Sequence, residues 1–217
     1  GGESAVKAGA ETVLNGDESA TKQPSKAIIS YSLYGANTRY TDGAIANAKL
    51  IKQVYPHNWT MRVYYDNSVP SSVIKQLESS QVQLINMDGS KLNKMSWRFL
   101  AASDAKFFCA RDIDSRLSKR EAAAVEEWVH SGKKFHVMRD HPSHSKYAMS
   151  GGMWCSRTIP NIRELISNTK SQAYLEDMNF LNKVIWPLAQ KSLLQHDSFS
   201  CDKFGGARPF PTKRVGW

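Results

Sequence analysis

The stretch Arg111-Asp112-Ile113-Asp114-Ser115-Arg116 follows the apolar run from Ala105 to Ala110, and this junction decides how the chain is interpreted. The apolar run predicts a buried strand. Two carboxylates one residue apart at the end of such a strand can bind one divalent cation beyond the carboxyl edge of the sheet, where open α/β sheets bind their ligands. A diphosphate held by that metal would fit there. For an isolated Asp-x-Asp, a solvated turn whose acids cap the next segment is the commoner explanation.

Composition describes a globular chain with a basic bias. The 217 residues are 41% hydrophobic and 10% aromatic, which is typical of a soluble protein with one sizeable core. The 29 Lys and Arg residues against 20 Asp and Glu favour an anionic partner such as a nucleotide, a phosphate or an acidic glycan. The basic residues stand among acidic neighbours, so nucleic acid is not indicated, and a solvated basic surface explains the bias equally well. The three cysteines form no short-spaced metal pair, and an odd number cannot make a closed disulfide framework.

The N-terminal part differs from the rest of the chain. Residues 1–25 are small and polar, which predicts a flexible tail or linker, and the fold is expected to occupy residues 26–217. No apolar run reaches the length of about 18 residues that a membrane span needs, and the first residues lack the apolar stretch of a signal peptide. The compartment stays open, with the cytoplasm as the first expectation, and we expect the chain to be part of a longer protein.

From Lys26 onward, strand-like apolar runs alternate with amphipathic stretches. Strands are expected at 27–31, 61–65, 82–87, 105–110, 135–138 and near 193. Helices are expected at 44–54, 71–79, 97–102, 162–167 and 175–185. A further helix opens with a Ser118/Glu121 capping box and ends at Ser131-Gly132. This order predicts a single α/β domain whose central, mostly parallel, twisted sheet is flanked by helices.

Four polar segments follow the expected strands and should meet in one crevice. They are residues 31–35, 112–116, 139–152 and 196–210. His196 could be a third ligand of Mn²⁺, which accepts imidazole beside carboxylates, or a hydrogen-bonded structural histidine. Arg98, among apolar neighbours, could pair with an acid of the Asp-x-Asp or with a phosphate, or could extend outward from a core helix. The spacing of His136, His141 and His144 matches no zinc signature.

The order of these landmarks resembles that of nucleotide-sugar glycosyltransferases with the Rossmann-like GT-A fold. The nearest pattern is that of glycogenin and the lipopolysaccharide galactosyltransferases, and it extends from about Lys26 to Phe210. The matching segments are Asp112-Ile113-Asp114, Ser150-Gly151-Gly152-Met153, Leu175-Glu176-Asp177-Met178-Asn179-Phe180-Leu181-Asn182, and His196 followed by Arg208-Pro209-Phe210.

The resemblance implies a role for each matching position. Asp112, Asp114 and His196 would hold Mn²⁺ or Mg²⁺, and Asp112 could also contact the donor. The donor, most simply a UDP-sugar, would contact Tyr31, Ser32, Tyr34 and Gly35 through its base, Arg98 through its diphosphate, and Gly151 and Gly152 through its sugar. Asp177 would face the reacting sugar or the acceptor hydroxyl, as the first candidate for a catalytic base, with Asp140 as the second.

Some positions depart from the resembled pattern. Met178 and Asn179 stand where that family has Gln and Asp, so its retaining chemistry is not implied, and Glu176-Asp177 equally resembles the acidic pair of inverting enzymes. Asp177 could also be a helix N-terminal acid that complements the macrodipole. The segment 139–142 and the sequence Gly-Gly-Met-Trp at 151–154 have no counterpart in the pattern, which indicates a separate family on the same fold.

The sequence thus predicts a metal-dependent enzyme that moves a hexose from a nucleotide-diphosphate sugar to a hydroxyl of a glycan or glycoprotein. A metal-dependent phosphohydrolase or a non-catalytic carbohydrate- or nucleotide-binding module would carry the same clusters. The sugar, the acceptor, the stereochemistry and the oligomeric state stay open.

Overall fold

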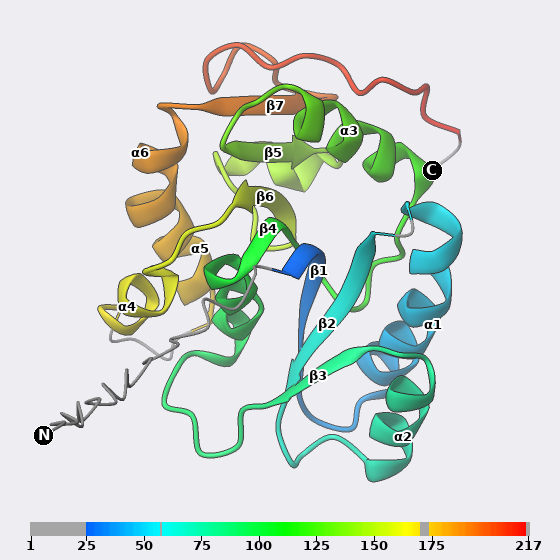
Figure 1. Cartoon of the computed structure of the whole chain (residues 1–217). Coiled ribbons are helices and arrows are strands. Elements are labelled where there is room, and N and C mark those ends of the chain that lie inside the picture. The colour runs from blue at the N-terminus through cyan, green and yellow to red at the C-terminus, as the bar shows by residue number, and fades with distance from the viewer. Residues whose placement is uncertain (1–24, 57, 170–173, 216–217) are drawn as a thin grey trace, which may run out of the picture.

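A computed structural model describes residues 25–56, 58–169 and 174–215 (Figure 1). The tail expected at residues 1–25 falls outside these ranges, apart from Ser25. Within them, seven strands form one sheet in the order β3-β2-β1-β4-β6-β5-β7. Their bounds, in that order, are Gln83–Asn86, Trp59–Tyr65, Ser25–Leu33, Ala105–Arg111, Met153–Arg157, Phe135–Arg139 and Leu193–Asp197.

The sheet is mostly parallel, as the alternation of strands and helices predicted. Strands β1 to β4 are mutually parallel where they pair, and β5 is parallel to β7. Strand β6 runs antiparallel to both β4 and β5 and joins the two parallel groups. The sequence did not predict β6, because its five residues are buried or nearly so on both faces and show no alternation of apolar and polar residues.

Helices cover both faces of the sheet (Figure 1). Helices α1 (Thr38–Val54), α2 (Ser71–Ser79) and α3 (Lys119–His130) pack on one face. The 3₁₀ helix η1 (Lys94–Ser103) and the helices α4 (Ile162–Ser167), α5 (Glu176–Phe180) and α6 (Trp186–Ala189) pack on the other. Alternate residues of β1 enter the two cores, with Ile29 beneath α1 and Ile28 beneath η1. The α/β architecture is therefore confirmed.

Two helical segments differ most from their expected bounds. Helix α1 begins at Thr38, six residues earlier than expected, because the Asn37 side chain accepts a hydrogen bond from the Arg39 amide and caps it. The helix expected at 175–185 is divided into α5, the π-helical turn η3 (Leu181–Ile185) and α6. Pro187 has no amide hydrogen and displaces the carbonyl four residues earlier, which favours the wider turn there.

Cys109 and Cys155 face each other across the antiparallel pair of β4 and β6 and form a disulfide, with their Cα atoms 4.0 Å apart. Both residues are fully buried. The odd number of cysteines gave no indication of this disulfide, whose partners are 46 positions apart, and Cys201 is the free thiol. Among the described residues no helix is long and apolar enough to cross a membrane.

Candidate active site

The Asp-x-Asp motif lies in a turn directly after β4, at the carboxyl edge of the sheet. Ile113, between the two acids, is buried and anchors the turn. From α1, the Asn47 amide donates to the carbonyl oxygens of Ile113 at 3.2 Å and of Ser115 at 2.8 Å. Gly43 lets α1 approach, since a Cβ atom there would lie 2.2 Å from the Ile113 oxygen. The fold thus fixes the backbone that presents the two carboxylates.

Arg98 joins the Asp-x-Asp turn to helix α5. Its Nη1 lies 2.6 Å from Asp112 Oδ1, and its Nη2 lies 3.1 Å from Asp177 Oδ2. Nη1 also donates to the Arg111 carbonyl, while the Arg98 amide donates to Ser32 Oγ on β1. Arg98 therefore contacts β1 through its amide, and its guanidinium joins the end of β4, the Asp-x-Asp turn and α5. Its expected proximity to the Asp-x-Asp motif is observed.

The charges of this cluster stabilise one another. Burial would lower the pKa of Arg98, but Asp112 and Asp177 outweigh burial and raise that pKa above its ordinary value. Burial would likewise raise the pKa of Asp112, but the Arg98 guanidinium holds it below the usual carboxyl range. Both groups are therefore charged at neutral pH. The second oxygen of Asp177, Oδ1, is buried and has no hydrogen-bond partner among the described residues.

The paired glycines make close backbone contact with these side chains. A Cβ atom at Gly151 would lie 2.5 Å from Arg98 Nη2 and 2.6 Å from Asp177 Oδ2. A Cβ atom at Gly152 would lie 2.3 Å from Asp112 Oδ2. Real Cβ atoms do not approach so closely, so a larger residue at either position would displace the ends of these side chains. The two glycines thus lie at the same site as Asp112 and Asp177, as the sequence predicted.

Asp114 is paired with Arg39 from the first turn of α1. Arg39 Nε and Nη2 lie 2.8 and 2.6 Å from the same carboxylate oxygen, Asp114 Oδ2. The Arg39 side chain is 72% exposed, so this pair contributes little to stability. Each acid of the motif is thus held through one of its two oxygens. A cation such as Mg²⁺ commonly takes one or two protein carboxylates together with phosphate oxygens, and the donor set present here fits that coordination.

A cavity of about 460 Å³ opens beside this cluster. Its size lies within the range of small-ligand sites. It is bordered by two arginines and two aspartates, and by tyrosine side chains from the position after β1, from α1 and from the segment before α5. The lining residues are Ser32, Leu33, Tyr34, Arg39, Tyr40, Met95, Arg98, Asp112, Ile113, Asp114 and Tyr174. Aromatic rings next to paired charges can hold a base and a diphosphate.

Two of the four residues expected to contact the donor base do not line this cavity. Tyr31 is fully buried and packs in the core beneath α1, because it shares the inward parity of Ile29 on β1. Gly35 lies in the turn after β1, with φ +76°, and its amide donates to Ser68 Oγ. Ser32 and Tyr34 do line the cavity.

The structure does not bring His196 to the Asp-x-Asp pair. His196 lies on β7, three strands away from β4, which is a distance of roughly 14 Å at the usual spacing of strands. Both its ring nitrogens are engaged, Nδ1 with His136 Nε2 at 2.8 Å and Nε2 with Glu127 Oε2 at 2.5 Å. Within the described part of the chain, no three His, Cys, Asp or Glu side chains converge on a common metal position.

Asp140, the second expected base, is enclosed by cations. Arg120 donates to both of its carboxylate oxygens, and Arg214 and Ser198 also bond to it. Burial would raise the pKa of Asp140, but these hydrogen bonds outweigh burial and lower it to about 2. A carboxylate with this pKa is a weak proton acceptor at neutral pH.

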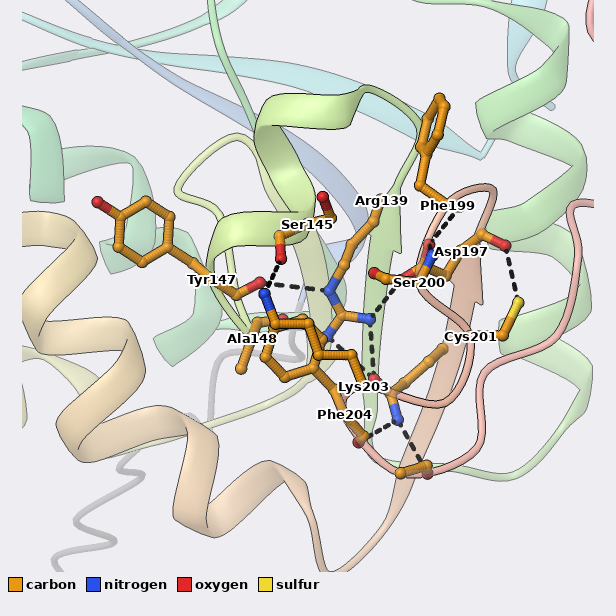
Figure 2. Close-up of polar contacts among 12 residues, drawn as sticks. Arg139, Ser145, Tyr147, Ala148, Asp197, Phe199, Ser200, Cys201, Lys203 and Phe204 are labelled. Carbon is orange, nitrogen blue, oxygen red and sulfur yellow. Dashed lines mark hydrogen bonds and ion pairs between the residues drawn. The ribbon is translucent and has the colours of Figure 1, made fainter.

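The connection from β5 to β6, residues 140–152, is tied down by a second arginine. The Arg139 guanidinium pairs with Asp197 at 3.3 Å and donates to the carbonyl oxygens of Tyr147 and Ala148 (Figure 2). Lys203 Nζ donates to the Ser145 carbonyl at 2.7 Å, as Figure 2 also shows. The connection includes a 3₁₀ turn, η2 (Pro142–Lys146), and then leads to Gly151 and Gly152. It is therefore a braced segment of the site.

Sequence reasoning missed Arg39 and Tyr40 because it began α1 at Ala44, and it missed Asn47 because no local pattern marked its contacts with the turn after β4. Asn37 directly after the polar segment 31–35 was the available signal, since an N-cap there places residues 38–40 at the carboxyl edge of the sheet. His144 was considered only as a zinc ligand. No local pattern marked its approach to Asp112, which depends on the course of the β5–β6 connection.

No family model matches the chain, and no curated protein matches it in sequence. Its structure is similar to glucosyl-3-phosphoglycerate synthase from Mycobacterium tuberculosis in complex with UDP, with a TM-score of 0.53 and 11% identity over 88% of this chain and 74% of that chain. For a mannosyltransferase from Pyrobaculum calidifontis in complex with GDP-Man and Mn²⁺, the TM-score is 0.53 and the identity 15%, over 86% of this chain and 59% of that chain. For TarS from S. aureus in complex with UDP, the TM-score is 0.51 and the identity 14%, over 82% of this chain and 62% of that chain. The chain therefore has the GT-A fold.

Proposed function

We propose that the protein is a glycosyltransferase that moves a hexose from a nucleotide-diphosphate sugar, most simply a UDP-sugar, to a hydroxyl of a glycan or glycoprotein. One observation carries this proposal: a buried arginine holds Asp112 and Asp177 at the carboxyl edge of the sheet, beside a cavity with room for a nucleotide. Solved structures with the same fold hold UDP, GDP-Man and Mn²⁺. Fold alone does not define an activity, so the residues must carry the argument.

In this proposal, Asp112 and Asp114 hold Mn²⁺ or Mg²⁺ together with the donor diphosphate. The cation, when bound, neutralises charge that develops on the departing diphosphate. Arg98 holds Asp112 in place through one oxygen. Ser32, Tyr34 and Tyr40 border the space for the nucleotide, and the backbone of Gly151 and Gly152 borders the transferred sugar. The chain itself supplies two carboxylates, and the phosphate oxygens complete the site.

Asp177 is the proposed base that accepts the proton of the acceptor hydroxyl. Its Oδ2 is fixed by Arg98, which leaves the buried Oδ1 as the oxygen able to take a proton. Leu175, just before α5, has the left-handed backbone angle φ +66°, which is costly for a leucine and is retained mostly where function requires it. The Asp140 carboxylate is stabilised by Arg120 and Arg214 and is the weaker candidate.

A donor panel tests the proposal. The protein is incubated with Mn²⁺, a set of UDP- and GDP-sugars and simple glycan acceptors, and the released nucleoside diphosphate and the glycosylated product are both measured. We expect product with one donor, loss of donor binding in excess chelator, and a fall in turnover by orders of magnitude in Asp114→Asn.

Glu78→Gln serves as the matched control, because Glu78 is an exposed acid near the end of α2 and lies outside the cluster. Donor affinity that is unchanged by chelator would refute the metal-bridged diphosphate. Cleavage of phosphate esters without an acceptor would identify a phosphohydrolase, and binding without turnover would identify a binding module.

A further inference from the structure

A second and smaller cavity shares Asp112 with the first. Its volume is about 140 Å³, which is below that of most complete ligand sites and suits a single ring or fragment. Gly152, just before β6, and Met153, its first residue, border it, together with side chains from the turn after β4, from α3 and from the β5–β6 connection. Asp112 therefore separates two spaces, and only the larger one has the aromatic walls that suit a base.

The walls of the smaller cavity combine hydrogen-bond donors and acceptors. Asp112, Glu121 and Asp140 contribute acids, while Arg111, Arg116 and His144 contribute donors. An anion would face three carboxylates, and an apolar group would leave the polar side chains without partners. A hydroxyl donates one hydrogen bond and accepts others, so a ring that carries several hydroxyls matches a mixed wall of this kind.

His144 contributes to this wall a ring with an unpaired nitrogen. Its Nδ1 is buried and has no hydrogen-bond partner among the described residues. Buried polar atoms are nearly always paired, and one that is not commonly awaits a ligand or a water. Glu121 differs, because its carboxylate is already held by Arg111 at 3.2 Å. His144 therefore has unused hydrogen-bonding capacity.

The chain holds His144 in a fixed place. The carbonyl oxygen of the next residue, Ser145, accepts a hydrogen bond from Lys203, and the carbonyl oxygens of Tyr147 and Ala148 accept from Arg139 (Figure 2). A side chain on a braced segment can recognise a ligand without first paying the entropy of ordering that segment.

We propose that the smaller cavity binds a monosaccharide ring through its hydroxyls, with His144 as the residue that selects among sugars. The inference rests on the proposed function, in which the reacting centre lies next to Asp112. The ring is either the hexose of the donor or the terminal sugar of the acceptor, since both present the same hydroxyl chemistry.

Nuclear magnetic resonance of the histidine rings tests this directly. The imidazole signal of His144 is assigned by its loss in His144→Gln, and the signal of His130, exposed at the end of α3, serves as the internal control. Millimolar glucose, galactose, mannose and xylose are added singly, in the presence and absence of Mn²⁺ and UDP. Then UDP and the UDP-sugars are compared.

The two sources of the ring give different results. A shift of the His144 signal by a free sugar, retained when UDP and Mn²⁺ are present, assigns the cavity to the acceptor. A shift by a UDP-sugar that UDP alone does not cause assigns it to the donor. In either case His144→Gln should weaken the affinity for that ligand about five- to tenfold, as expected for one hydrogen bond, while His130→Gln leaves it unchanged.

The outcome separates this inference from the proposed function. One outcome is transfer activity with an unmoved His144 signal and an unchanged affinity in His144→Gln. It would overturn the cavity assignment and leave the proposed glycosyltransferase activity supported. Free-sugar binding at His144 in a protein that transfers nothing would overturn the proposed glycosyltransferase activity and support the sugar-binding cavity. If no sugar or nucleotide sugar moves the signal, the cavity assignment is refuted whatever the activity.

Discussion

Arg98 and Asp177 form an ion pair across 79 positions of sequence, with Nη2 and Oδ2 3.1 Å apart and side-chain exposures of 9% and 4%. Arg98 binds Asp112 at the same time. The pair therefore fixes the distance between the proposed metal motif and the proposed base. Because the other Asp177 oxygen is buried without a partner among the described residues, this carboxylate is held at a cost in stability that a purely structural role does not explain.

Replacing Asp177 by Asn keeps the size of the side chain and removes its ability to accept a proton. We expect turnover at saturating donor and acceptor to fall about a hundredfold or more, with donor affinity retained. The free energy of unfolding should fall by roughly 1–3 kcal/mol, because the buried Arg98 loses a charged partner. A helix-end acid would cost well under about 1 kcal/mol and little activity.

Glu176→Gln is the matched control for this experiment, since Glu176 is the preceding residue and bonds only to Asn179 among the described contacts. Transfer kinetics and thermal melting are measured for both variants. Normal transfer by Asp177→Asn would reduce Asp177 to an ion-pair partner of Arg98.

Arg39 should compete with the metal for Asp114. Its guanidinium lies 2.6 Å from the carboxylate oxygen, and its exposure makes the pair easy to break. We expect Arg39→Gln to bind Mn²⁺ several-fold more tightly than the unsubstituted protein in the absence of nucleotide, because a competing positive charge is removed. Calorimetric titration with Mn²⁺ measures this.

Two variants control for charge in the Arg39 experiment. Arg39→Lys retains a cation and should change Mn²⁺ affinity less, whereas Lys49→Gln removes an exposed cation elsewhere on α1 and should leave it unchanged. Equal Mn²⁺ affinity in Arg39→Gln and the unsubstituted protein would show that Asp114 does not take the metal or that Arg39 does not oppose it. A loss of Mn²⁺ binding in Asp114→Asn separates these two explanations.

The elements that the sequence predicted well are those with local signatures. Strand β4 is a buried apolar run that ends in acids, and α3 is opened by Ser118 and Glu121, whose amide donates to Ser118 Oγ. Tyr31 could have been placed correctly, because its parity on β1 is that of the buried Ile29. The inference instead followed the resemblance, in which the first residues after the strand hold the base.

The partnerships that build the site have no such signature. The contact of Arg98 with Asp177 and the disulfide of Cys109 with Cys155 join segments that meet only when the sheet is assembled. His196 was expected at the metal because it comes late in the chain and beside an acid. Strand order decides its position instead, and β7 lies at the edge of the sheet.

The Cys109–Cys155 pair predicts a specific pattern of thiol labelling. Alkylation of the unfolded protein without reductant should modify Cys201 alone, and alkylation after reduction should modify all three cysteines. A loop of 46 positions gives a stabilisation of about 4 kcal/mol in the chain-entropy treatment, so reduction should lower the melting temperature markedly.

Cys201→Ser is the control for the disulfide and should leave the melting temperature and its response to reductant unchanged. Three modified thiols without reductant would show that the pair is not formed. A formed pair would favour an oxidising compartment over the cytoplasm that the sequence first suggested.

A buried histidine pair should make the fold sensitive to acid. His136 is fully buried, stacks on Trp128 and bonds to His196, which in turn bonds to Glu127. Burial lowers the pKa of His136 well below its ordinary value, and burial also lowers the pKa of His196 even though Glu127 opposes that change. The folded protein therefore holds both rings neutral at a pH where the unfolded chain would already bind protons.

The sign of the pH dependence follows from this difference. Below the histidine pKa of about 6.5 the unfolded state binds more protons than the folded state. The free energy of unfolding is therefore highest above that pH and decreases as the pH falls. We expect the melting temperature to drop between about pH 7 and pH 5, and to drop less in His136→Gln, whose side chain does not titrate. His130→Gln, at an exposed position, should keep the full drop. Parallel curves for the unsubstituted protein and His136→Gln would place the acid sensitivity elsewhere.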